Sequence, residues 1–133
     1  MRILMVDDEA AFRDVLIKRF QKRGMNAFGV GCGREAVRKM ATQKYHVVLL
    51  DVCMPGMDGI AVLKQIRAAQ PNCEVIMLTG HACLQSAAEG MALGAFDYLM
   101  KPVDMEALIF KIEDAFEKVQ LNLNKQHKEN RVT

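Results

Sequence analysis

The sequence predicts an α/β protein with one doubly wound, five-stranded parallel sheet, for which we expect the strand order 2-1-3-4-5. Short β-rich runs alternate with amphipathic stretches at helical spacing, and this alternation is typical of consecutive βαβ units. With 133 residues, the chain fits a single domain. Its hydrophobic content of 51% can form a core without disulfides and excludes a disordered chain.

The first half of the chain provides three predicted strands and two predicted helices. Residues 2–6, 26–30 and 47–50 are the short strand-like runs, and the last is continuously apolar, as in a strand buried on both faces. Between the first two runs, apolar side chains recur at helical spacing at Phe12, Val15, Leu16 and Phe20. Gly24 ends this predicted helix. A second helix begins near Gly33, with one apolar face formed by Ala36, Val37, Met40 and Ala41.

The second half continues the same alternation. Residues 53–59 are rich in turn formers, and the helix after them closes before Pro71. The apolar positions of that helix are Ile60, Leu63 and Ile66. Two more strands are predicted at residues 74–78 and 95–100, and the helix between them at residues 82–93. Asp104 is placed to cap a long final helix, which completes a flavodoxin-like (βα)5 arrangement.

Charge is unevenly distributed along the chain. The formal net charge is +2. Residues 118–133 contain four basic residues and one acidic residue, so they carry +3 and the rest of the chain carries −1. A nearly neutral body argues against direct nucleic-acid binding, which needs clustered Lys and Arg.

The cysteines and the apolar runs indicate a cytoplasmic protein. The four cysteines contain no C-x-x-C pair, which argues against a zinc site or a redox dithiol, so we expect reduced and mostly buried thiols. No apolar run approaches the ~20 residues that span a bilayer. The first residues become acidic too early for a signal peptide, and no membrane association is expected.

Polar and charged side chains follow the predicted strands where each strand ends. Asp7 and Asp8 follow the first strand, Asp51 the third, Thr79 the fourth and Lys101 the fifth. Because ligands of doubly wound sheets bind outside the carboxyl ends of the strands, we expect these groups to converge at one edge.

This set of residues predicts chemistry on a phosphoryl group. Carboxylates brought close together resist ionising unless a cation lies among them, and hard oxygen ligands suit Mg²⁺. A carboxylate at such a site, facing a lysine and a hydroxyl, can act as a nucleophile towards a phosphoryl donor.

In this arrangement the sequence resembles the receiver domains of two-component response regulators, over residues 1–120. Four segments carry the resemblance, in order at strand ends: Val6-Asp7-Asp8, Leu50-Asp51-Val52-Cys53-Met54-Pro55-Gly56-Met57-Asp58-Gly59, Leu78-Thr79-Gly80 and Tyr98-Leu99-Met100-Lys101-Pro102. The resemblance implies a phosphorylation-dependent switch that assists its own phosphorylation and dephosphorylation, rather than an enzyme acting on a separate substrate.

The resemblance also assigns a role to each residue. Asp51 is the expected phosphoacceptor, with a sensor histidine kinase or a phosphotransfer protein as donor. The implied Mg²⁺ ligands are the carboxylates of Asp7, Asp8 and Asp51 and the backbone carbonyl of Cys53. Lys101 is expected to pair with the phosphoryl group. The peptide bond between Lys101 and Pro102 is expected to be cis. Thr79 and Tyr98 are the implied switch pair.

Two further positions flank the expected site. His81 lies two residues beyond Thr79, where it either positions or hinders the attacking water or stays idle in solvent. Cys53 lies two residues beyond Asp51, and we interpret it as a neutral neighbour rather than a nucleophile. The glycine at position 80 leaves an open approach.

The final helix leaves two interpretations open. Its apolar stripe is formed by Met105, Ile109, Ile112, Phe116, Val119 and Leu123. The stripe either packs on the sheet or, towards its end, continues as a coiled-coil or linker helix, so we expect residues 121–133 to form a helical extension or linker. The resemblance implies a downstream protein or output domain as partner, controlled through the face formed by the fourth helix, the fifth strand and the fifth helix. It also implies a second copy of the chain that binds on phosphorylation.

Two other classes share parts of this pattern. Phosphatases of the haloacid-dehalogenase type need a second aspartate two residues after the nucleophile, where this chain has Cys53. Flavodoxin-like electron carriers need a phosphate-binding loop after the first strand, where the acids at residues 7–9 would repel a phosphate. Both classes are disfavoured.

Overall fold

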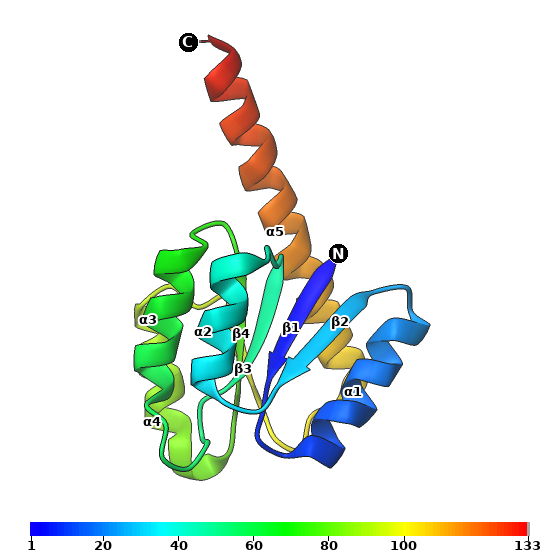
Figure 1. The fold of residues 1–133 in the computed structure, drawn as a ribbon, viewed down its shortest axis with the longest axis vertical. Helices are drawn as coiled ribbons and strands as arrows, with labels where there is room; N and C mark the ends of the chain where they lie inside the picture. The colour runs from blue at the N-terminus through cyan, green and yellow to red at the C-terminus, as the bar shows by residue number, and fades with distance from the viewer. Residues whose placement is uncertain (133) are drawn as a thin grey trace.

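The computed structural model describes residues 1–132 as a five-stranded parallel sheet flanked by helices (Figure 1). The strands are β1 (Arg2–Val6), β2 (Asn26–Val30), β3 (Val47–Asp51), β4 (Glu74–Thr79) and β5 (Asp97–Met100). The helices are α1 (Ala10–Lys22), α2 (Gly33–Thr42), α3 (Gly59–Ala69), the 3-10 turn η1 (His81–Cys83), α4 (Leu84–Ala92) and α5 (Met105–Val132). The order β2-β1-β3-β4-β5 confirms the predicted fold.

The sheet separates two hydrophobic clusters, because alternate residues of each strand point to opposite faces. On one face Leu4 and Val6 of β1 pack with side chains from α2, α3 and α4. On the other face Ile3 and Met5 pack with side chains from α1 and α5. Burial on both faces makes β3 and β4 fully buried, and the continuous apolar run 47–50 predicted this for β3.

The helix before β5 differs from the prediction at both ends. Residues 81–83 form a 3-10 turn, and α4 begins only at Leu84. At the other end Gly94 has φ 96°, and the amide of Ala95 donates to the carbonyl of Gly90. That hydrogen bond assigns Ala95 to the helix end, so β5 starts at Asp97 rather than at residue 95.

Helix α5 packs on the sheet through its first half and extends beyond the body through its second half (Figure 1). Asp104 caps it as predicted, since its Oδ1 accepts a hydrogen bond from the amide of Glu106 at 3.2 Å. Val119 is the last buried residue of α5 among residues 105–130, whose burial the structure describes. Further along, the side-chain amides of Gln126 and Asn72 exchange hydrogen bonds of 3.1 and 3.2 Å.

Within residues 1–132, no helix combines the length and apolar character that a membrane span requires.

Candidate functional site

Three aspartates gather at the carboxyl ends of β1 and β3. Asp7 is fully buried, Asp51 is 3% exposed and Asp8 is exposed. Each offers a carboxylate oxygen, and these three oxygens all lie within 4.8 Å of one another. The parallel register of β1 and β3, with Val6 beside Leu50, brings the following aspartates to the same edge, as the sequence predicted.

The ammonium group of Lys101 lies among these acids. Its Nζ is 2.8 Å from Asp7 Oδ2 and 3.2 Å from Asp51 Oδ2. Burial alone would lower the pKa of Lys101, but the hydrogen bond to Asp7 and the charges of Asp51 and Asp7 outweigh it and raise that pKa to about 12. Lys101 therefore stays charged at neutral pH. The bond between Lys101 and Pro102 is cis, as the resemblance implied.

Asp51 is held by two donors and still resists ionisation. Its Oδ1 accepts a hydrogen bond of 2.8 Å from the amide of Cys53, and its Oδ2 faces Lys101. Burial raises the pKa of Asp51, and the charge of Asp7 raises it further, while the Cys53 amide and Lys101 lower it. The net shift of the Asp51 pKa is upward, because burial, together with the charge of Asp7, outweighs the Cys53 amide and Lys101.

The donor set fits a divalent cation. Asp7, Asp8 and Asp51 supply hard carboxylate oxygens, and an excess of negative charge remains after Lys101 is counted. An open pocket of about 380 Å³ adjoins them, lined by Asp8, Glu9, Asp51, Cys53, Pro55, Gly80 and Lys101. Mg²⁺ keeps several waters or phosphate oxygens among its ligands, so a few carboxylates beside an open pocket suit it well.

Thr79 and Tyr98 lie on neighbouring strands but differ in exposure. Thr79 ends β4 fully buried, and its hydroxyl donates to the carbonyl of Gly80 at 3.0 Å. Tyr98 is 39% exposed in β5. The register pairs Met77 with Tyr98 and Thr79 with Met100, so Thr79 and Tyr98 point to the same face of the sheet.

The prediction that the cysteines are reduced is wrong for Cys53 and Cys83, and the prediction that they are mostly buried is wrong for Cys32. Cys53 and Cys83 form a disulfide, and Cys32 is an exposed free thiol. Cys73 is free and buried, and burial raises its pKa to about 12. The two bridged residues are 30 positions apart, and only the packing of the β3–α3 loop against η1 brings them together.

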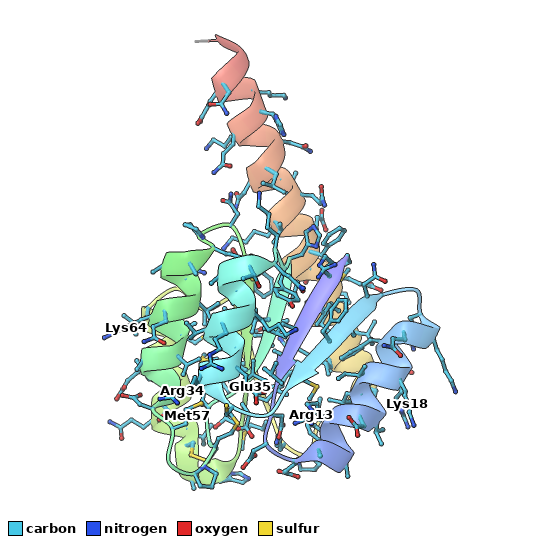
Figure 2. The ribbon with its side chains drawn as sticks, viewed as in Figure 1. Arg13, Lys18, Arg34, Glu35, Met57 and Lys64 are labelled. Atoms are coloured by element: carbon cyan, nitrogen blue, oxygen red, sulfur yellow. A yellow bond between two sulfur atoms is a disulfide. The ribbon has the colours of Figure 1, made fainter. Side chains whose placement is uncertain are left out.

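Three neighbours of the site were not predicted from the sequence. Glu9 Oε1 lies 3.4 Å from Lys101 Nζ, and the ring centre of Phe12 lies 4.6 Å from the same atom. Arg13 extends from α1, and its Nη1 donates to the backbone carbonyl of Asp7 at 2.7 Å (Figure 2). Glu9 could have been found from the sequence, because it directly follows Asp7 and Asp8. Phe12 could not, because its spacing in the helix is that of a core residue.

The comparisons with known proteins identify the class. A family model described as the response regulator receiver domain matches residues 3–113. This match covers most of the chain, so the protein belongs to the receiver domains of two-component response regulators.

Individual relatives agree with this assignment. The chain is 38% identical over 116 residues to the regulatory protein AtoC of Escherichia coli (strain K12), covering 87% of this chain and 25% of AtoC. It is 36% identical over 118 residues to the DNA-binding transcriptional regulator NtrC of the same strain, covering 89% of this chain and 25% of NtrC. The chain thus spans about a quarter of the length of these curated relatives.

Solved structures show the same fold. A CheY-like receiver domain protein from Methanospirillum hungatei JF-1 superposes with a TM-score of 0.86 at 28% identity, covering 91% of this chain and 97% of that chain. A chain described as adenylate cyclase from Rhodopirellula baltica gives a TM-score of 0.91 at 28% identity, covering 97% and 96%.

Proposed function

We propose that this receiver domain accepts a phosphoryl group on Asp51 from a sensor histidine kinase or phosphotransfer protein in the cytoplasm. The observation that carries the proposal is the contact of Lys101 Nζ with both Asp7 and Asp51 beside an open pocket. The carboxylate of Asp51 attacks the phosphorus, the bond from phosphorus to the donor imidazole breaks, and the imidazole leaves after taking up a proton.

The residues of this chain supply positioning and charge. Asp7, Asp8, Asp51 and the carbonyl of Cys53 would hold Mg²⁺, which neutralises phosphoryl oxygens when bound. Lys101 Nζ, 3.2 Å from Asp51 Oδ2, is within reach of an oxygen of a phosphoryl group attached there. The amide of Cys53 fixes the orientation of the Asp51 carboxylate. His81 is exposed and directly follows Gly80, which lines the open pocket, so we infer that it can influence the approach of water.

The switch follows from the new charge. A phosphoryl group adds roughly −1.5 to −2 charge and strong acceptor oxygens. The hydroxyl of Thr79 then leaves the carbonyl of Gly80 and donates to the phosphoryl group, and Tyr98 turns into the vacated space. The exposure of Tyr98 supports this role, because its ring does not already occupy a buried position.

The surface of α4, β5 and α5 is the proposed output face. Large apolar side chains are exposed on these elements and the loop between α4 and β5: Met91, Leu93, Tyr98 and Phe110. A contiguous patch of exposed apolar side chains is typical of a protein-binding site, and we infer that these residues contribute to one. We infer that residues 1–120 form the receiver and that residues 121–133 connect it to an output domain or pair with a second copy. We do not expect this chain to bind nucleic acid directly.

Incubation with acetyl phosphate and Mg²⁺ tests the phosphoacceptor. On a phosphate-affinity gel we expect a shifted band for the wild type and none for Asp51→Asn. Asp58→Asn is the matched control, because Asp58 lies in the same loop and Asn preserves its capping of α3. Removal of Mg²⁺ by a chelator should abolish the shift. Equal shifts for the wild type and Asp51→Asn, or no shift in the wild type, would overturn the assignment.

A further inference from the structure

The Cys53–Cys83 disulfide joins the two loops that border Asp51. Cys53 lies in the β3–α3 loop, two residues after Asp51, and lines the open pocket. Cys83 ends η1, four residues after Thr79, and immediately precedes α4. The bridge therefore ties the loop that follows the phosphoacceptor to the loop that follows the proposed switch hydroxyl.

Each end of the bridge is hydrogen-bonded to a component of the site. The amide of Cys53 donates to Asp51 Oδ1 at 2.8 Å. The amide of Cys83 donates to the carbonyl of Gly80 at 3.1 Å, and that carbonyl also accepts the hydroxyl of Thr79 at 3.0 Å. The disulfide thus holds in place the acceptor that keeps Thr79 in its resting position.

The bridge is placed for reversible chemistry. Both cysteines are half-buried, and Cys53 lines the open pocket, so a small thiol can approach the bridge from that side. Their Cα atoms are 5.8 Å apart, the usual separation for a disulfide, so the fold brings the two thiols together again after reduction. Disulfides of intracellular proteins are commonly transient and redox-sensing.

We propose that Cys53 and Cys83 form a thiol–disulfide exchange site that controls the phosphoacceptor, an inference that rests on the proposed function. In the oxidised form the bridge restrains the β4–α4 loop and slows both the movement of Thr79 and the phosphorylation of Asp51. Reduction frees the two loops and lets the switch operate.

The exchange needs a low-molecular-weight thiol, such as glutathione, as reductant. Its thiolate attacks one sulfur, the Cys53–Cys83 bond breaks, and the other cysteine leaves as a thiolate that takes up a proton. A second thiol displaces the protein from the mixed disulfide. The two electrons come from the two small thiols, which leave as their own disulfide.

The test compares oxidised and reduced wild-type protein after the reagents are removed. Alkylation under denaturing conditions should count two free thiols in the oxidised form, Cys32 and Cys73, and all four in the reduced form. With acetyl phosphate and Mg²⁺, we expect reduced protein to be phosphorylated several-fold faster. Amide exchange at Cys83 should also be faster in reduced protein.

Two variants separate the bridge from other effects of the reagents. Cys83→Ser should match reduced wild type after either treatment, whereas Cys32→Ser should keep the full redox response. Equal phosphorylation rates in wild-type samples whose thiol counts differ would overturn the exchange site and leave the phosphoacceptor assignment standing. A redox response that persists in Cys83→Ser would also overturn it. Absence of phosphorylation in both redox forms would overturn the phosphoacceptor assignment and this inference with it.

Discussion

Lys101 Nζ is closer to Asp7, at 2.8 Å, than to Asp51, at 3.2 Å, although Asp7 lies 94 residues away in the chain. Both aspartates are buried, so the ammonium group balances two carboxylates that have little contact with water. A cation bound by Asp7 would compete for the same carboxylate and release Lys101 towards the phosphoryl group. Under the proposed function, we therefore expect Lys101 to act in both the resting and the phosphorylated form.

Replacing Lys101 with alanine should weaken the fold in the absence of Mg²⁺. The change leaves the buried carboxylates of Asp7 and Asp51 without their ammonium partner, which should lower the free energy of unfolding by about 2–4 kcal/mol. Urea denaturation in a chelator measures the loss, and Mg²⁺ should recover much of it.

Lys101→Ala should also fail to show the conformational change that Mg²⁺ and beryllofluoride produce in the wild type. Lys64→Ala is the matched control, because Lys64 is exposed on the outer side of α3 (Figure 2). A wild-type beryllofluoride response in Lys101→Ala would remove Lys101 from the switch.

Asp51→Asn should stabilise the protein at neutral pH when Mg²⁺ is absent. Burial raises the folded-state pKa of Asp51 above 3.8, so the folded protein holds this proton more strongly than the unfolded chain. The contribution of Asp51 to stability is fully present below about pH 3.8 and is lost as the pH rises through the raised pKa.

Urea denaturation from pH 4 to pH 7 should therefore show the stability of Asp51→Asn rising relative to that of the wild type. Asp58→Asn, measured beside it, corrects for a general loss of one carboxylate. A constant difference between Asp51→Asn and the wild type across this range would contradict the raised pKa.

Magnesium should stabilise the wild type through the three aspartates. A ligand that binds only the folded state at ten times its dissociation constant adds about 1.4 kcal/mol. Asp8→Asn should lose most of this gain without loss of the fold, because Asp8 is exposed. Thermal melting with and without Mg²⁺ measures the effect, and Asp14→Asn, an exposed acid of α1, should keep the wild-type response.

The site was predictable from the sequence where a parallel sheet alone determines the geometry. Asp7 and Lys101 directly follow β1 and β5, Asp51 is the last residue of β3, and parallel strands bring their carboxyl ends to one edge. No knowledge of loop conformation is needed for that step, so the carboxylates and the lysine were placed together correctly.

Loop conformation explains what the sequence did not reveal. The Cys53–Cys83 bridge depends on how the β3–α3 loop packs against η1, and neither spacing nor composition encodes that contact. The late start of β5 depends on the hydrogen bond from Ala95 to Gly90, which competes with strand pairing. The first difference arises from tertiary packing between two distant segments, and the second from a local hydrogen bond at the end of α4.

Removing residues after Gln120 should leave the fold intact and tests whether the extension pairs two copies. Val119 is the last buried residue of α5, so the shortened chain keeps the packed part of the helix. If the extension pairs two copies, sedimentation with Mg²⁺ and beryllofluoride should detect a dimer of the full chain and a monomer of the shortened one. Leu121→Lys, at an exposed apolar position, should weaken the dimer without truncation. Identical sedimentation of all three proteins would contradict a dimerising helix.

Reduction of the disulfide should lower the stability of the whole domain. Cys53 and Cys83 close a loop of 30 residues, for which the chain-entropy model gives about 3–4 kcal/mol. Urea denaturation of oxidised wild type, reduced wild type and Cys83→Ser measures the difference. The two unbridged proteins should unfold at similar, lower urea concentrations, because both lose the same restraint on the unfolded chain.

Cys32→Ser should retain the stability of the oxidised form, since Cys32 is outside the bridge. Equal midpoints for the oxidised and reduced wild type would show that the bridge leaves stability unchanged.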